Sequence, residues 1–233
     1  MSTFLEAVQD LARELDLPSV PSSAEGQSGE FLDVVRWYQQ AYRDIENRHT
    51  WRWLRRTATL STTASDGSYT SANFTDTTDS AAISRFGSWR VTDRDDPPKI
   101  YLSSAGVGGE RWLIYTPWEW FKSIYDIGTQ VDGAPAHIAV DPNNNIRLGP
   151  KPDSTYVVTL DYYMSPQTLD EDEDEPAMPA RYHDLIIYRA MVKYGYREAA
   201  GEVISRAKEE AARLMRQLEN DQMEPWRDGG TFA

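Results

Sequence analysis

Hydrophobic positions recur at intervals of three and four from Ser28 toward Trp53, a spacing typical of an amphipathic helix. The apolar stripe consists of Phe31, Val34, Val35, Tyr38, Ala41, Tyr42 and Ile45. Ser28 is placed to cap this helix, because its hydroxyl can accept a hydrogen bond from a free backbone N–H of the first turn. After Arg48 and His49, the sequence moves into β-branched and aromatic residues that favour a strand, namely Thr50, Trp51 and Trp53. The pattern predicts a long helix that leads into a sheet, and we expect the first and last helices of the chain to cover its stripe.

Three further helices are predicted near the two ends of the chain. Thr3 and Glu6 have the spacing of a capping box, and helical periodicity follows up to about Asp16. A helix is expected from about residue 180 to 197, and a final helix from about 198 to 222. The sequence thus places two helices before a central region and two after it.

The final helix carries its own amphipathic pattern. Its apolar stripe consists of Val203, Ala207, Ala211, Leu214 and Leu218. Glu202 and Arg206 are four residues apart, as are Glu209 and Arg213, so both pairs are expected to form ion pairs along the helix surface. These pairs would leave the apolar stripe free to pack against the other helices.

The central region, from Leu54 to about Ser165, has short apolar segments divided by clusters of Gly, Pro, Asn and Asp, as antiparallel hairpins have. The predicted strands are 55–61, 84–91, 99–103, 112–115, 136–140, 145–148 and 156–163. The clearest hairpin has its turn at Pro142–Asn144. A short helix is expected to start where Thr116 caps it and Pro117 takes its first position. The predicted fold class is therefore α+β, a helical bundle from the N- and C-terminal segments with an inserted antiparallel β domain.

These patterns divide the chain into four parts. Residues 1–53 and 176–222 are expected to form the helical domain, and residues 54–165 the inserted β domain. Residues 166–175 are predicted to be an acidic linker, because they include six consecutive Asp and Glu side chains. Residues 223–233 lack periodicity and are predicted to be a docking tail, because burying an aromatic side chain is worth on the order of 2 kcal/mol and a free tail cannot bury its own.

Composition narrows the function. The 233 residues include eight Trp and thirteen Tyr, enough for a sizeable core, and no Cys. The formal charge is −13, or about −13 + 6 = −7 without the acidic run. This negative charge argues against a protein that binds nucleic acid through its phosphates. No run of eighteen apolar residues occurs, so a membrane span or secretory signal is not expected.

No motif for catalysis, cofactor binding or metal binding is found. His49, His137 and His183 lack the spacing of a metal site, so structural or surface roles are expected for them. The acidic run Asp170–Glu175 lacks the glycine and spaced ligands of a calcium loop, and a solvated linker is favoured over a weak divalent-cation site. Gly106–Gly109 is followed by no helix, so a hairpin tip is favoured over a phosphate-binding loop. We expect no catalytic residues, cofactor or metal.

Two other classes of function stay open. A carbohydrate-binding module of a phage host-attachment protein would use aromatic faces to stack on sugar rings. Its candidates are Trp89, Trp112, Trp118 and Trp120. A hydrolase with paired carboxylates such as Glu119 and Asp126 would need the two acids to converge in a cleft.

Three segments at the two ends of the chain resemble the head-to-tail adaptor, or connector, proteins of tailed bacteriophages. They are FLEAVQDLARELDL, GQSGEFLDVVRWYQQAYRDIENRHTWRWLRR and PAMPARYHDLIIYRAMVKYGYREAAGE. The most specific part is an amphipathic helix that passes through Asp44–Glu46 into Trp51–Leu54, followed much later by a proline-containing entry to a helical pair. The resemblance covers somewhat less than half of the chain.

This resemblance implies a non-enzymatic virion protein of the neck, made in the host cytoplasm, that joins the portal to downstream tail or neck proteins. It implies a homo-oligomeric ring, commonly of twelve subunits, through which DNA passes during ejection without sequence-specific binding and without a membrane. A C-terminal extension would reach the portal, which makes Trp226, Arg227 and Phe232 the docking candidates. Off-stripe residues of the long helix are the candidates for contacts between subunits: Arg36, Trp37 and Arg43. Trp51 and Trp53 are expected at the junction between the ring body and the β domain.

Overall fold

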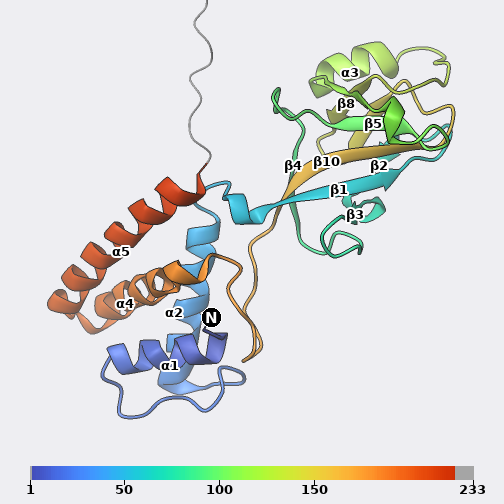
Figure 1. The fold of residues 1–233 in the computed structure, drawn as a ribbon. Coiled ribbons are helices and arrows are strands. Elements are labelled where there is room, and N and C mark those ends of the chain that lie inside the picture. Colours follow the sequence, from blue (N-terminus) through green and yellow to red (C-terminus); the bar gives the residue numbers. More distant parts are fainter. Residues whose placement is uncertain (1, 224–233) are drawn as a thin grey trace, which may run out of the picture. The chain divides into compact units, whose positions relative to one another are not determined.

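The computed structural model describes residues 2–223, and the chain divides into two compact units. A helical unit combines Met1–Leu54 with Pro166–Ala233, and a β unit consists of Arg55–Ser165. Helices from both ends of the chain thus share one unit, and the strands belong to the other (Figure 1). The predicted α+β fold class is confirmed.

The helices are α1 (Phe4–Glu14), α2 (Gly29–Glu46), α3 (Trp118–Tyr125), α4 (His183–Glu198) and α5 (Gly201–Gln222). The strands are β1 (Arg55–Ser61), β2 (Ser68–Tyr69), β3 (Thr75–Asp76), β4 (Phe86–Arg90), β5 (Lys99–Leu102), β6 (Arg111–Trp112), β7 (Ile114–Tyr115), β8 (His137–Val140), β9 (Ile146–Gly149) and β10 (Tyr156–Met164). Short 3₁₀ turns lie at Arg52–Leu54, Ser71–Asn73, Val107–Gly109 and Ala180–Tyr182.

Helix α1 begins at the predicted capping box. The Thr3 hydroxyl accepts a hydrogen bond from the backbone N–H of Glu6 at 3.3 Å, and the Thr3 backbone N–H donates to the Glu6 carboxylate at 3.1 Å. Two donors of the first turn are thereby satisfied. The apolar face that follows is fully buried, which fixes α1 against the rest of the helical unit.

Helix α2 buries the predicted stripe, but its neighbours differ from the expectation. It packs mainly on α4 and more lightly on α1, whereas α5 packs on α4. The prediction that the last helix covers α2 is therefore wrong, because α4 lies between the two helices (Figure 1). Ser28 does occupy the N-cap position of α2, but its side chain makes no capping hydrogen bond.

Two other predictions about the helices need correction. The ion pairs expected within α5 are not formed, because Arg206 instead reaches Glu14 of α1 at 2.9 Å and Arg213 pairs with Glu210 at 2.8 Å. Helix α3 has Pro117 at its N-cap, one position later than predicted, and Thr116 makes no cap. For Arg206, the partner on another helix replaces the weak pair with Glu202 on the same helix.

The acidic run is not a purely solvated linker, because it is bound to the start of α1. The backbone N–H of Phe4 donates to the Asp174 carbonyl at 2.7 Å, and that of Leu5 donates to the Asp172 carbonyl at 3.1 Å. The Asp172 carboxylate also accepts from the backbone N–H of Ala24 at 2.5 Å. N–H groups at the start of a helix have no partner within the helix, so the run satisfies donors that α1 cannot.

The transition from α2 to the β unit is a turn, in place of the predicted early start of a strand. Residues Arg52–Leu54 form a 3₁₀ turn, and β1 begins at Arg55. The Trp51 indole N–H donates to the Ile45 carbonyl at 2.8 Å, near the end of α2. This bond holds Trp51 against the helix end, which is incompatible with continuing directly into an extended strand.

The β unit contains two sheets. In the first, the long strand β10 pairs with β1 along one edge and with β5 and β4 along the other, in the order β3-β1-β10-β5-β6. The second sheet has the order β2-β9-β8-β7. Their buried residues form one apolar core: Ala58, Leu60, Tyr69, Phe74, Val91, Ile100, Leu113, Ile138, Ile146, Leu148, Tyr156, Val158, Leu160 and Tyr162.

One pair of strands departs from the antiparallel expectation. Strand β7 runs parallel to β8, and helix α3 lies between them in the chain. A parallel pair needs such a long connection, whereas antiparallel neighbours can be joined by a tight turn. The predicted hairpin at Pro142–Asn144 joins β8 and β9, and the Asp141 carboxylate accepts hydrogen bonds from the backbone of Asn143 and Asn145.

Candidate interaction surfaces

The three histidines have hydrogen-bonding partners within the protein. His49 contacts Glu219 at 3.1 Å, and His137 contacts the Tyr125 hydroxyl at 2.6 Å. His183 is buried and lies within hydrogen-bonding distance of the Ser2 hydroxyl and of the Met178 carbonyl. Within residues 2–223, no group of three or more His, Asp or Glu side chains is arranged to hold a metal ion.

The two carboxylates considered for hydrolysis lie at opposite ends of α3. Glu119 is in the first turn, is exposed and pairs with Lys122 at 2.7 Å. Asp126 is the C-cap and lies 3.7 Å from Arg147. Asp126 lines a small cavity of about 120 Å³, but Glu119 does not. The structure therefore does not bring this pair together around one cleft.

Trp51 and Trp53 stack on one another at the end of the helical unit. Their rings are 4.7 Å apart with an interplanar angle of 16°, and His49 meets Trp51 edge-on at 4.9 Å. Trp51 is completely buried, whereas Trp53 is half-buried and its indole N–H has no hydrogen-bond partner in the part of the chain that the structure describes. The boundary between the two units follows directly, at Leu54 and Arg55.

The three candidates for contacts between subunits lie on α2 in different surroundings. Arg36 and Arg43 are exposed. Trp37 is half-buried, because its ring meets Tyr194 edge-on at 5.8 Å and the Arg197 guanidinium lies 5.3 Å from its centre. Much of Trp37 is therefore used to bind α4 within the subunit. The docking candidates Trp226, Arg227 and Phe232 lie outside the described residues.

A single segment of the β unit carries most of the exposed apolar surface. Among residues 2–223, eight of the eleven exposed large apolar side chains lie between residues 107 and 131. They are Val107, Trp112, Ile114, Tyr115, Trp120, Ile124, Ile127 and Val131. We call residues 107–131 the exposed apolar segment. Such a concentration marks an interaction site more often than a free surface.

The geometry of this segment explains why its side chains point outward. Leu113 between β6 and β7 is 1% exposed, so its neighbours Trp112 and Ile114 project away from the core and are 69% and 61% exposed. Trp120 and Ile124 are four residues apart and share the outer face of α3, while Phe121 fills the inner face. Sequence patterns alone could not separate these residues from core aromatics.

The other two tryptophans considered for sugar binding are partly used inside the β unit. Trp89 packs against Phe74 and Phe86, and its indole N–H donates to the Asn144 carbonyl at 2.8 Å. Trp118 stacks with Phe121 at 6.0 Å. Only Trp112 and Trp120 of the four candidates present largely open rings.

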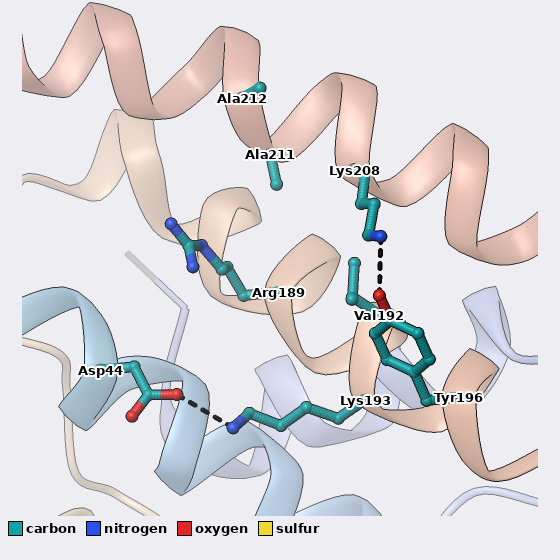
Figure 2. Close-up of a pocket in the computed structure, with 8 residues that line it drawn as sticks. All are labelled: Asp44, Arg189, Val192, Lys193, Tyr196, Lys208, Ala211 and Ala212. Atoms are coloured by element: carbon teal, nitrogen blue, oxygen red, sulfur yellow. Dashed lines mark hydrogen bonds and ion pairs between the residues drawn. The ribbon is translucent and has the colours of Figure 1, made fainter.

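The helical unit has a cavity of about 370 Å³ between α2, α4 and α5, which sequence analysis missed (Figure 2). It is lined by Asp44, Arg189, Val192, Lys193, Tyr196, Lys208, Ala211 and Ala212. Lys193 donates to the Asp44 carboxylate at 2.9 Å, and Lys208 donates to the Tyr196 hydroxyl at 2.7 Å. The only sequence signal was that the stretch now assigned to α4 mixes apolar and polar faces.

Arg189 is the unusual member of this cavity. Its Nε is buried and has no hydrogen-bond partner among the described residues. Burial lowers the pKa of the guanidinium, the nearby charge of Arg48 lowers it further, and Asp44 and Glu219 act in the opposite direction. With three cationic side chains and one carboxylate, the cavity carries a net charge of 3 − 1 = +2, in a chain whose formal charge is −13.

None of the helices within residues 2–223 is long and apolar enough to cross a membrane. No curated protein matches the chain. The family model described as "SU10 adaptor protein" matches residues 2–231, which is nearly the whole chain and includes both units. The match extends the resemblance from the terminal helices to the β unit. The chain therefore belongs to the SU10 adaptor protein family, and it is a structural adaptor protein of a bacteriophage.

Proposed function

We propose that this adaptor forms a closed ring, commonly of twelve copies in such connectors, that joins the portal to the tail in the virion neck. The match to the adaptor family over residues 2–231 carries this proposal. In it, the helical unit forms the ring body, Trp51 and Trp53 form the junction to the β unit, and Arg36, Trp37 and Arg43 contribute to contacts between subunits. The exposed apolar segment supports an assembly role, because monomeric proteins rarely leave so many large apolar side chains in water.

The tail after Met223 is proposed to dock on the portal through Trp226, Arg227 and Phe232. Two aromatic side chains in a segment of ten residues gain the free energy of burial only against another surface. Truncation after Met223 is expected to abolish attachment to portal rings, while the circular dichroism spectrum of the subunit stays unchanged. Attachment of the truncated chain at full strength would refute the tail assignment.

The ring is also proposed to be part of the DNA conduit. A formal charge of −13 disfavours tight binding of phosphates, so DNA can slide through during ejection. The pure protein is expected to bind duplex DNA weakly at physiological salt. Tight binding with a steep dependence on salt concentration would contradict this part of the proposal.

Carbohydrate binding is the second candidate function, and the exposure of two tryptophan rings favours it. Trp112 is 69% exposed and Trp120 is 70% exposed, so much of each ring is available for stacking on a sugar. Saturable binding to a glycan array that is lost in Trp112→Ser and Trp120→Ser would support this function. Ring assembly that depends on the same two residues, without glycan binding, would support the adaptor ring.

A further inference from the structure

The cavity of the helical unit contains Arg189, whose Nε has no hydrogen-bond partner within residues 2–223, although the Asp44 and Glu219 carboxylates interact electrostatically with the guanidinium. Arg189 keeps its positive charge under physiological conditions, because a guanidinium loses its proton only at very high pH. The Arg48 charge repels it, and Lys193 and Lys208 line the same cavity. A half-buried cation in this position is stabilised when an anion enters the cavity beside it.

The other cavity residues favour binding of an anionic group that also has some apolar surface. Lys193 and Lys208 add positive charge at the rim, and Val192 with Ala211 supplies apolar wall (Figure 2). Among the described residues, Asp44 is the only carboxylate that lines the cavity, and Lys193 already neutralises it. A volume of about 370 Å³ accommodates one or two carboxylate side chains.

Within the described part of the helical unit, the acidic run contains a group of carboxylates without partners. Within residues 2–223, four of its six side chains are exposed and make no hydrogen bond or ion pair: Asp170, Glu171, Glu173 and Glu175. The other two, Asp172 and Asp174, point inward and hold the run in place, since their carboxylates accept backbone N–H groups. The run therefore presents its outward carboxylates from a fixed backbone.

The cavity and the acidic run lie on different sides of the helical unit. Figure 1 shows α5 on one side of α2 and the segment that carries the acidic run on the other. The run contacts the start of α1, whereas the cavity lies between α2, α4 and α5. Two different, complementary patches on opposite sides of a subunit are what a head-to-tail contact in a closed ring requires.

We infer that the cavity around Arg189 and Lys208 binds the acidic run of a neighbouring copy of this chain, so that each copy donates one run and receives another. The inference rests on the proposed ring and names one of its contacts. Charge complementarity selects this occupant: the cavity carries +2, and four outward carboxylates of the run have no partner within residues 2–223. A nucleic-acid phosphate is the weaker choice, because the rest of the chain repels it.

Charge reversal tests the contact in the full chain. Lys208→Glu on an exposed site and Arg189→Glu inside the cavity are each expected to raise the protein concentration needed for assembly by at least about tenfold. Arg216→Glu, an equal charge change at another exposed site of α5, is the matched control and is expected to have little effect. Circular dichroism establishes that each variant folds, and Lys208→Glu keeps the test valid if Arg189→Glu does not.

Rescue separates a direct contact from a general loss of stability. A chain that carries Lys208→Glu together with Glu171→Lys and Glu173→Lys is expected to recover most of the assembly that Lys208→Glu loses, because both sides of the contact are reversed in every copy. Failure of this rescue, or an equal effect of Arg216→Glu, would overturn the inference.

Cross-linking places the contact between copies, and the absence of native cysteines makes it simple. One chain carries only Glu173→Cys, and a second chain with a different affinity tag carries only Lys208→Cys. Oxidation of the mixed assembly is expected to produce a disulfide-linked heterodimer, whereas Arg216→Cys in place of Lys208→Cys yields little.

The outcomes distinguish this inference from the proposed ring. Rings that form normally without the cross-link between positions 173 and 208 would refute the acidic contact and leave the ring standing. Absence of rings both in solution and on the portal would refute the ring and the contact together. Duplex DNA binding that is lost in Lys208→Glu, with assembly unchanged, would assign the cavity to phosphate and overturn the inference.

Discussion

Replacing each of the two stacked tryptophans by phenylalanine is predicted to have very different consequences for stability. In Trp51→Phe the hydrogen bond to the Ile45 carbonyl is lost, at a cost of about 1 kcal/mol. Trp51 is completely buried, so the smaller ring costs about 1 kcal/mol more through lost packing. The Ile45 carbonyl still accepts from the backbone N–H of Arg48 at 3.2 Å, which prevents a larger penalty. The expected loss is about 2 kcal/mol.

Trp53→Phe is the matched control, because the same chemical change removes a buried indole N–H that has no partner. Losing an unsatisfied donor offsets the lost packing of a half-buried ring, so the free energy of unfolding is expected to change by less than about 0.5 kcal/mol.

Urea unfolding followed by circular dichroism at 222 nm measures both variants, since the signal comes mainly from helices. Thermal unfolding followed by the same signal is a second measurement, in which a loss of about 2 kcal/mol lowers the melting temperature by about 4–8 °C in a chain of this size. Equal losses in the two variants, or an unchanged midpoint in Trp51→Phe, would refute the roles assigned to the two rings.

Two further predictions concern close packing and pH. Gly195→Ala is expected to destabilise the helical unit by about 1–3 kcal/mol in urea unfolding, because the new methyl would lie 2.6 Å from the Ile204 side chain. Gly201→Ala is the control and is expected to be neutral or stabilising, because no atom lies within 4 Å of its new methyl. A larger loss of stability in Gly201→Ala than in Gly195→Ala would contradict this packing. Burial raises the pKa of Asp76, but hydrogen bonds from the Tyr162 hydroxyl and the backbone outweigh it and hold the pKa below its ordinary value. This ionised carboxylate therefore stabilises the folded β unit above about pH 4, and the stabilisation is lost as the pH falls through the lowered pKa. Asp76→Asn is expected to flatten the dependence of unfolding free energy on pH between about 5 and 2, and an unchanged profile would contradict the assignment.

Several elements were predictable because their signals are local. The capping box at Thr3 and Glu6 depends on residues three apart, and the bounds of β1 follow from its composition and flanking residues. The turn at Pro142–Asn144 is specified by its own sequence. In each case the determining interactions lie within a few residues, so the sequence window contains them.

Other features depend on distant partners and were not predicted. Strands β2 and β3 have two residues each, too few for a periodic pattern, and exist because β9 and β1 offer them backbone partners. The acidic run has a composition typical of solvated linkers, yet free N–H groups at the start of α1 bind it. The exposed apolar segment and the cavity around Arg189 likewise emerge only when several elements are placed together.

This adaptor is proposed to close into a ring on the portal. Electron microscopy of the purified chain mixed with portal particles from the same phage tests it most directly. We predict a single closed ring of copies stacked on one face of the portal, and loss of that ring after truncation at Met223. Portal particles that stay bare at saturating protein concentration, or that bind isolated copies without a closed ring, would contradict the account.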